Sequence, residues 1–284
     1  VLACPQSIAW LLNVRATDVP CTPLPLSYAV LYKDRSVDWF IGKDRLSDDV
    51  LNALGDNVRI VEPASLESHF TNVSKLTKVG LDFARASVAF KTLLEKGSCE
   101  IVNQKDPCID IRACKTDAEI EGMKAAHIRD GKALTKALDW ITKEDSKGTL
   151  TEMFVDRKLE ECRKETGALK DLSFPAIVGW AENGAVVHYR VSEESSLPIK
   201  GQGLLLIDSG GQYVDGTTDV TRTIALGGDP TDEQKKAFTL VLKGHVSVAS
   251  AVFPEGTTGG QIDLLARKAL WNEGFDYGHG TGHG

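Results

Sequence analysis

Short runs of apolar residues alternate with polar turns along the first hundred residues of the chain. Residues 28–32 and 37–41 flank the polar stretch 33–36, a pattern that predicts a β-hairpin. Further strands are expected at residues 58–61, 78–83 and 99–102, and helices at residues 47–54, 65–72 and 87–96. This alternation predicts a small α/β domain over residues 1–110. The domain contains neither a phosphate-binding glycine loop nor a cluster of catalytic side chains.

A longer helical pattern opens the second half. Thr116 and Glu119 have the spacing of a capping box, and a long helix is expected to follow them. The side chains that fall on one face of this helix are Ile120, Met123, His127, Leu134, Leu138 and Ile141. On that face, His127 is expected to be packed and hydrogen-bonded instead of binding a metal. Thr149 and Glu152 repeat the capping spacing before a second helix that ends near residue 164.

Antiparallel strand pairs and two further helices are expected after these helices. They cover residues 176–179, 185–189, 203–209, 219–226, 230–252 and 261–272. Helices followed by antiparallel strands, and then repeated, predict an α+β domain over residues 111–284. Two similar halves around a curved sheet would fit this pattern.

Composition and charge narrow the class of protein. Hydrophobic residues make up 42% and charged residues 26% of the chain, which is typical of a globular protein. The net charge of -7 argues against a general affinity for nucleic acid or anionic membranes. No apolar run approaches the ~20 residues that cross a bilayer. The six cysteines form no CxxC pair, which predicts reduced thiols in a cytoplasmic protein.

The candidate chemistry begins with Asp208 and Asp219, each at the end of an expected strand. Antiparallel strands joined by the glycine-rich segment between them can bring the two carboxylates together on one side of the sheet. Close carboxylates repel unless a cation or a proton lies between them, and a divalent metal pair would meet that need. The alternative is that both residues satisfy backbone amides in a turn, which is what we expect of Asp215 before Gly216.

His279 and His283 lie four residues apart among glycines. If this stretch is extended, both side chains point to the same face, so that one could bind metal while the other contacts a substrate. The chain stops one residue after His283, inside its densest motif, and we expect it to be a fragment of a metallohydrolase.

His188 follows the apolar stretch Ala185-Val-Val187. It could be a buried, hydrogen-bonded histidine. It could also face the same pocket and move protons, because the pKa of histidine lies near neutrality. Spacing leaves both possibilities open.

Several stretches together resemble the pita-bread metallopeptidases, and among them the Xaa-Pro aminopeptidases of the eukaryotic, cytosolic, three-domain form. They are Ser7-Ile-Ala-Trp-Leu-Leu-Asn-Val-Arg15, Ala118-Glu-Ile-Glu-Gly-Met-Lys-Ala-Ala-His127, Asp171-Leu-Ser-Phe-Pro175, Ala185-Val-Val-His-Tyr189, Ile207-Asp-Ser-Gly210, Asp215-Gly-Thr-Thr-Asp-Val-Thr-Arg-Thr223 and His279-Gly-Thr-Gly-His-Gly284. The resemblance implies a creatinase-like α/β domain over residues 1–110, incomplete at its start. It implies an incomplete pita-bread catalytic domain over residues 111–284.

The resemblance also implies a role for each matching residue. Asp208 matches the carboxylate on one metal, Asp219 the carboxylate that bridges both metals, and His283 the histidine on the other metal. His188 and His279 match histidines that contact the substrate and steady the reacting carbonyl. The family implies manganese, a metal-bridging hydroxide that attacks the peptide bond before proline, peptides with N-terminal Xaa-Pro as substrates, and a homodimer.

The chain also departs from the family pattern. The family has two glutamate ligands after the last histidine, one of them the general base, and this chain has neither. We therefore expect the parent protein to be an active aminopeptidase and the fragment to be inactive. Prolidase, which cuts Xaa-Pro dipeptides, and a pseudopeptidase that binds protein partners are the alternatives. The stretch around Trp10 and Arg15 favours the aminopeptidase, and the presence of all three early ligands favours an enzyme.

Overall fold

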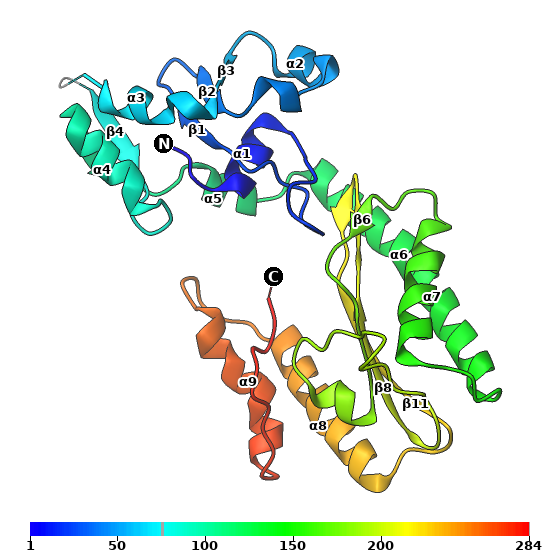
Figure 1. The fold of residues 1–284 in the computed structure, drawn as a ribbon. Helices are drawn as coiled ribbons and strands as arrows, with labels where there is room; N and C mark the ends of the chain where they lie inside the picture. The colour runs from blue at the N-terminus through cyan, green and yellow to red at the C-terminus, as the bar shows by residue number, and fades with distance from the viewer. Residues whose placement is uncertain (75–76, 284) are drawn as a thin grey trace. The chain divides into compact units, whose positions relative to one another are not determined.

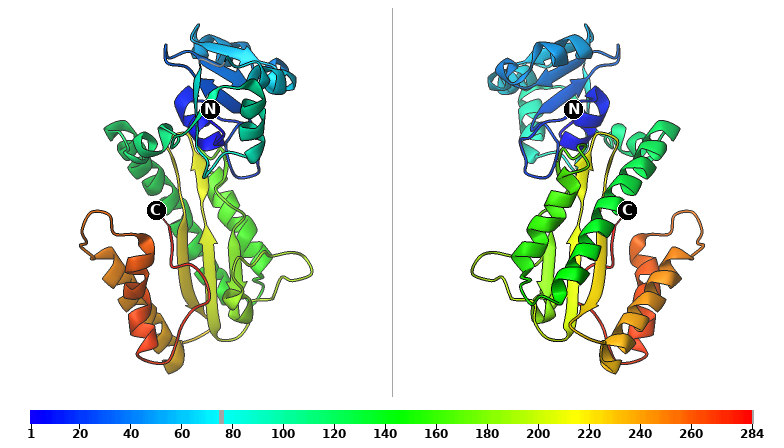
Figure 2. Two further views of the ribbon diagram at one scale, coloured as in Figure 1. Left: turned by 90° about the vertical axis from the view of Figure 1, so that its left-hand side faces the viewer. Right: turned by 90° about the vertical axis from the view of Figure 1, so that its right-hand side faces the viewer.

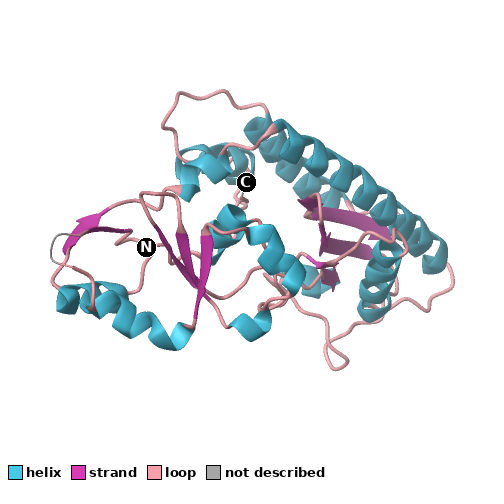
Figure 3. Ribbon diagram, turned by 90° about the horizontal axis from the view of Figure 1, so that it is seen from above, coloured by secondary structure: helices cyan, strands magenta, loops and turns pink. Residues whose placement is uncertain are grey.

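The structure is a computed structural model that describes residues 1–74 and 77–283, and these form two compact units (Figure 1). Unit 1 comprises Val1–His127, Lys170–Phe174 and Gln212–Thr217. Unit 2 comprises Ile128–Leu169, Pro175–Gly211 and residues 218–283. Both units mix helices and strands, as the sequence pattern predicts (Figure 3). The domain boundary expected near residue 110 stays a prediction.

Unit 1 is built around short strands that pair in both parallel and antiparallel directions. Its strands are β1 (Tyr28–Leu31), β2 (Val37–Phe40), β3 (Val58–Val61), β4 (Lys78–Leu81) and β5 (Glu100–Asn103). β2 pairs antiparallel with β1 and parallel with β3, while β4 pairs parallel with β5. A third sheet has the order β10-β9-β6, from Gly216–Thr217, Gly211–Tyr213 and Asp171–Leu172.

Helices cover these strands and close two small cores. They are α1 (Pro5–Leu12), α2 (Asp48–Leu54), α3 (Leu66–Thr71), α4 (Val88–Gly97) and α5 (Cys108–Ala113). Ser47 caps α2 by accepting a hydrogen bond from the backbone N–H of Val50, as expected from the sequence. Trp39 and Ile8 are buried in one core, and Phe70 and Phe90 pack edge to face in the other, with ring centroids 5.3 Å apart.

Unit 2 contains a three-stranded sheet with the order β11-β8-β7, together with helices that come before and after these strands in the sequence. Its strands are β7 (Ile177–Trp180), β8 (Gly203–Ser209) and β11 (Val220–Leu226), all antiparallel. Its helices are α6 (Asp117–Asp145), whose first part belongs to unit 1, α7 (Glu152–Lys164), α8 (Asp232–Ala249) and α9 (Gly259–Trp271). A 3-10 helix, Ala181–Ala185, follows β7.

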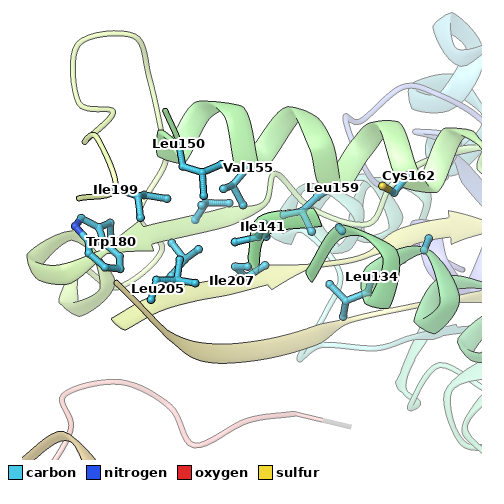
Figure 4. Packing of buried hydrophobic residues seen from close by; sticks show 14 residues of the cluster. Leu134, Ile141, Leu150, Val155, Leu159, Cys162, Trp180, Ile199, Leu205 and Ile207 are labelled. Atoms are coloured by element: carbon cyan, nitrogen blue, oxygen red, sulfur yellow. The ribbon is translucent and has the colours of Figure 1, made fainter. Parts of the chain in front are cut away.

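One face of this sheet forms the core of unit 2. Residues along β8 alternate between buried and half-buried, and the buried ones include Leu205 and Ile207. They pack against Ile141 of α6 and against Val155 and Leu159 of α7 (Figure 4). Because side chains alternate along a strand, Leu204, Leu206 and Asp208 point to the opposite face.

α8 and α9 run side by side as a helical hairpin (Figure 2). At their contact, a Cβ on Gly244 would lie 2.2 Å from the backbone oxygen of Ala266, so only glycine allows the two backbones this close. Among the described residues, no helix is both long enough and apolar enough to span a membrane.

The structure corrects three expectations for the second half. Residues 185–189 form the end of a 3-10 helix and a turn, not a strand. Thr151, and not Thr149, caps α7, because its hydroxyl accepts from the backbone N–H of Phe154 at 3.2 Å. His127 is exposed, although its Nδ1 lies 2.8 Å from the backbone oxygen of Met123; it is hydrogen-bonded but not packed.

Candidate metal centre

The register of β8 and β11 places the two candidate carboxylates on one face of the sheet. Asp208 is paired with Thr221, and Asp219 lies two residues before Thr221. Side chains two apart on an extended segment share a face, so Asp219 is directed to the side of Asp208. The two side chains interact closely enough for the Asp219 carboxylate to raise the pKa of Asp208. The role of these two carboxylates as metal ligands stays a prediction.

One carboxylate oxygen of Asp208 accepts no hydrogen bond from the described residues. Burial is the main cause that raises its pKa above the ordinary range; a hydrogen bond with Thr221 and the nearby His283 lower it. Among the described residues, its buried Oδ1 atom has no hydrogen-bond partner. A buried, unpaired acceptor beside a second carboxylate is costly unless a proton or a cation occupies the space.

His283 brings an imidazole to the same carboxylates. Its Nε2 lies 3.2 Å from Oδ2 of Asp219, and the His283 side chain is 78% exposed. Two carboxylates and an imidazole are donors that suit a divalent ion. Over residues 1–74 and 77–283, no three or more His, Cys, Asp or Glu side chains have the geometry to hold a metal ion. The three donors are near one another in pairs, His283 with Asp219 and Asp219 with Asp208, but their arrangement does not form a metal-binding group.

His279 is held in place by Arg267 of α9 and by the neighbouring Tyr277 ring. Arg267 on α9 donates to the backbone oxygen of His279 at 2.9 Å and to that of Tyr277 at 2.7 Å. The imidazole of His279 packs against the Tyr277 ring with centroids 4.8 Å apart. Residues 275–283 form a bend and irregular chain without strand pairing, and the shared face expected of His279 and His283 stays a prediction. The place of His279 beside the carboxylates stays a prediction.

His188 stands on a turn with an unusual backbone. Its φ is 55°, in the left-handed region, and its side chain is exposed. The alternative of a buried histidine is therefore wrong, and so is its placement at a strand end. Its position at the rim of the metal centre stays a prediction. Asp215 lies in the turn between β9 and β10, as the sequence predicts.

Buried residues that support the centre were not found from the sequence. Arg163 and Asp130 are almost completely buried, and Arg163 also donates to Ser209 Oγ at 3.1 Å, next to Asp208. The partners are 33 and 46 residues apart along the chain. No motif spacing marks such a pair, and on a charged helix Arg163 is indistinguishable from a surface residue.

Comparison with models of protein families gives two adjoining matches. Residues 121–284 match the metallopeptidase family M24, and residues 1–119 match the Creatinase/Prolidase N-terminal domain. Together these matches cover nearly the whole chain.

Curated relatives and solved structures agree with these matches. Probable Xaa-Pro aminopeptidases P of Paracoccidioides brasiliensis and Aspergillus niger are 39% and 40% identical, over 98% and 100% of this chain and 47% of each relative. An X-prolyl aminopeptidase of Caenorhabditis elegans, described as a cytosolic enzyme with a di-nuclear active site, matches with a TM-score of 0.89 and 32% identity. That match covers 99% of this chain and 46% of the nematode chain.

A Bacillus anthracis Xaa-Pro dipeptidase shares the fold, with a TM-score of 0.75 at 22% identity, over 100% of this chain and 76% of the dipeptidase. These similarities confirm the expected fold class, a creatinase-like domain followed by a pita-bread domain. The chain spans about half the length of the curated relatives it matches.

Proposed function

Because the chain belongs to metallopeptidase family M24, we propose that it is part of a metal-dependent aminopeptidase that removes the first residue from peptides with proline in second position. The observation that carries the proposal is the pairwise proximity of His283 to Asp219 and of Asp219 to Asp208, whose buried Oδ1 has no hydrogen-bond partner among the described residues. The similarity to Xaa-Pro aminopeptidases supports the substrate class.

Asp208, Asp219 and His283 are the residues that would hold divalent metal. Manganese is the metal we propose. When bound, a pair of such ions supplies a nucleophile from water at neutral pH and stabilises negative charge that develops on a carbonyl oxygen. The unpaired acceptor of Asp208 and the mixed oxygen and nitrogen donors fit this role.

The two remaining histidines would act on the substrate. His188 is exposed on its turn and can donate a hydrogen bond or a proton to the reacting carbonyl or the leaving amine. His279 would contact the peptide from the segment that also carries His283. Both roles come from the resemblance. We also propose that the protein is a cytoplasmic homodimer. We propose further that it has no affinity for nucleic acid, and the net charge of -7 is consistent with this.

The 284-residue chain contains three of the five protein ligands that the resemblance implies. Because metal affinity depends on ligand count, we expect weak metal binding and no cleavage from this chain alone. A chain extended to the length of its relatives should bind manganese and cleave. Elemental analysis, together with release of the first residue from an Xaa-Pro-Xaa peptide, compares the two forms. Full activity of the 284-residue chain would contradict the ligand argument.

In the extended protein, Asp219→Asn is expected to abolish activity, because a neutral amide lacks the negative charge with which the carboxylate would hold a divalent ion. His188→Ala is expected to lower turnover by about 10²-fold while bound metal stays largely intact. Asp215→Asn is the matched control, because Asp215 is a turn residue of the β9–β10 hairpin.

An Xaa-Pro dipeptide tested beside the longer peptide distinguishes an aminopeptidase from a prolidase. A protein that binds metal but cleaves neither peptide would be a pseudopeptidase.

A further inference from the structure

Glu152 is a fully buried carboxylate at the first turn of α7. Its Oε1 accepts hydrogen bonds from the backbone N–H of Trp180 at 2.7 Å and from Nδ2 of Asn183 at 3.1 Å. Its Oε2 accepts from the same Nδ2 at 3.1 Å, from the Tyr189 hydroxyl at 2.9 Å and from the backbone N–H of Leu197 at 2.8 Å. A buried carboxylate is very costly without such donors, so these contacts are what permit its burial.

All of these donors belong to the chain that surrounds His188. Trp180 ends β7, Asn183 lies in the 3-10 helix, and Leu197 lies beyond the turn that carries His188. Glu152 therefore ties segment 180–197 to α7 at both of its ends. It also holds the segment near its middle, through Tyr189.

His188 needs this support because its backbone is strained. A φ of 55° costs a residue other than glycine about 1–2 kcal/mol. Two backbone hydrogen bonds close the turn, from Val186 to Asn183 at 3.2 Å and from Tyr189 to Val186 at 3.1 Å. Such conformations persist where surrounding contacts determine them, and they gather at functional sites.

The side chain after His188 shows how the turn is held. Tyr189 is only 7% exposed, whereas His188 is exposed. Besides its contact with Glu152, the Tyr189 hydroxyl lies 2.9 Å from the backbone oxygen and 3.1 Å from Oγ of Ser195, and it accepts from Asn183 Nδ2 at 2.9 Å. With its far end fixed, Tyr189 restricts rotation of the backbone that it shares with His188.

From this arrangement we infer that Glu152 and Tyr189 are positioning residues for His188. They hold the turn so that the imidazole is exposed in one orientation, ready to meet a peptide carbonyl. The inference rests on the proposed function for the use of that orientation, but the positioning itself can be measured without any substrate.

NMR of the imidazole signals in the 284-residue chain tests the positioning. The His188 signal is the one that disappears in His188→Ala. Tyr189→Phe keeps the buried ring and removes the hydroxyl, and it is expected to shift the His188 imidazole and amide signals. If Tyr189→Phe does not fold, Ser195→Ala, which removes one partner of the same hydroxyl, takes its place. An unmoved His188 signal overturns the inference.

Tyr32→Phe is the matched control for this measurement. The Tyr32 hydroxyl donates to the buried Asp38 at 2.7 Å in unit 1, and it lies 3.2 Å from Nε2 of His69. The variant removes the same kind of contact, so it should shift the His69 signal and leave that of His188 unchanged. A His188 shift of equal size in the control would also count against the inference.

Kinetics of the extended protein test the consequence. Tyr189→Phe is expected to lower kcat about tenfold. A correctly positioned proton-transfer group raises the rate by ~10²–10⁴-fold, and the variant should lose only a part of that contribution because His188 itself is still present. KM and bound manganese should stay unchanged, which a general loss of structure would not produce. An unchanged kcat in a protein whose wild type is active overturns the inference. If the wild type cleaves no proline peptide, the proposed function fails, and the NMR result alone decides the positioning.

Discussion

At the scale of single residues, Asp208 and Ser209 are neighbours on β8 with opposite surroundings. Asp208 faces the candidate metal centre, while Ser209 is buried against Arg163 on the other face of the sheet. Arg163 forms two hydrogen bonds with Asp130, at 2.7 Å and 3.2 Å, so the guanidinium is well paired. A buried ion pair between α6 and α7 therefore anchors the end of β8 from behind the centre.

Removing one member of this pair should be costly. Asp130→Ala leaves the Arg163 charge buried without its main partner, and it is expected to destabilise the protein by about 3–5 kcal/mol. Urea unfolding followed by circular dichroism measures the change. Asp139→Ala is the matched control on the same helix, because Asp139 pairs with Lys143 at the surface and its loss should cost about 0.5 kcal/mol. Equal losses in the two variants would contradict the argument.

At the scale of elements, α9 organises the irregular chain that carries His279 and His283. Arg267 Nη1 donates to the Asp276 carboxylate at 2.9 Å, and the guanidinium carbon lies 4.0 Å from the centre of the Tyr277 ring. Asp263, one turn earlier on α9, pairs with Arg267 at 2.7 Å and accepts from the Thr281 hydroxyl. A segment without strand or helix is thus held by side chains of one helical face.

Arg267→Met should release this segment while keeping the aliphatic part of the side chain. Amide hydrogen exchange of residues 277–283 is expected to accelerate. In the extended protein, manganese affinity should fall about 10–100-fold, as is usual when support of a ligand is lost. Lys236→Met is the control, because it removes a cation that bridges α8 to Glu273 at 2.7 Å without touching the segment. Unchanged exchange in Arg267→Met would show that the segment is held by other contacts.

At the scale of the whole molecule, the two compact units have separate cores. The buried clusters of unit 1 use residues between Leu2 and Cys108, and the cluster of unit 2 uses residues between Ala133 and Leu226. Unit 1 also includes the short strands β6, β9 and β10, which are donated by the second half of the chain. Those strands contribute nothing to the two buried clusters of unit 1.

Residues 1–116 alone are therefore expected to fold and to unfold cooperatively. Thermal melting followed by circular dichroism is the measurement. Phe70→Ala should lower stability by about 3–5 kcal/mol, because Phe70 is 2% exposed in the core, whereas Phe83→Ala, at a position 46% exposed, should change it little. A broad, non-cooperative melt of residues 1–116 would show that unit 1 depends on the donated strands.

The sequence predicts the parts of this structure that local chemistry decides. Thr116 and Glu119 exchange capping hydrogen bonds as their spacing indicates, and the alternating pattern of β8 places Asp208 opposite the buried face. Residues 185–189 have the composition of a strand, but Glu152 binds Trp180, Asn183 and Tyr189 and draws the chain into a turn. Local propensity cannot anticipate a contact between residues 28–37 positions apart.

The candidate centre has a further consequence for the order in which it assembles as the polypeptide is synthesised. Residues 210–219, which contain the β9–β10 hairpin, join β8 to β11, and the two longer strands can pair quickly because their contacts are local in sequence. Asp208 and Asp219 can therefore meet while the ribosome is still adding α8 and α9. His283 arrives more than sixty residues later, so for an interval the nascent hairpin holds two facing carboxylates without the imidazole. In that interval, a solution cation or a proton would relieve their repulsion, and we therefore expect early folding of the hairpin to be sensitive to divalent ions.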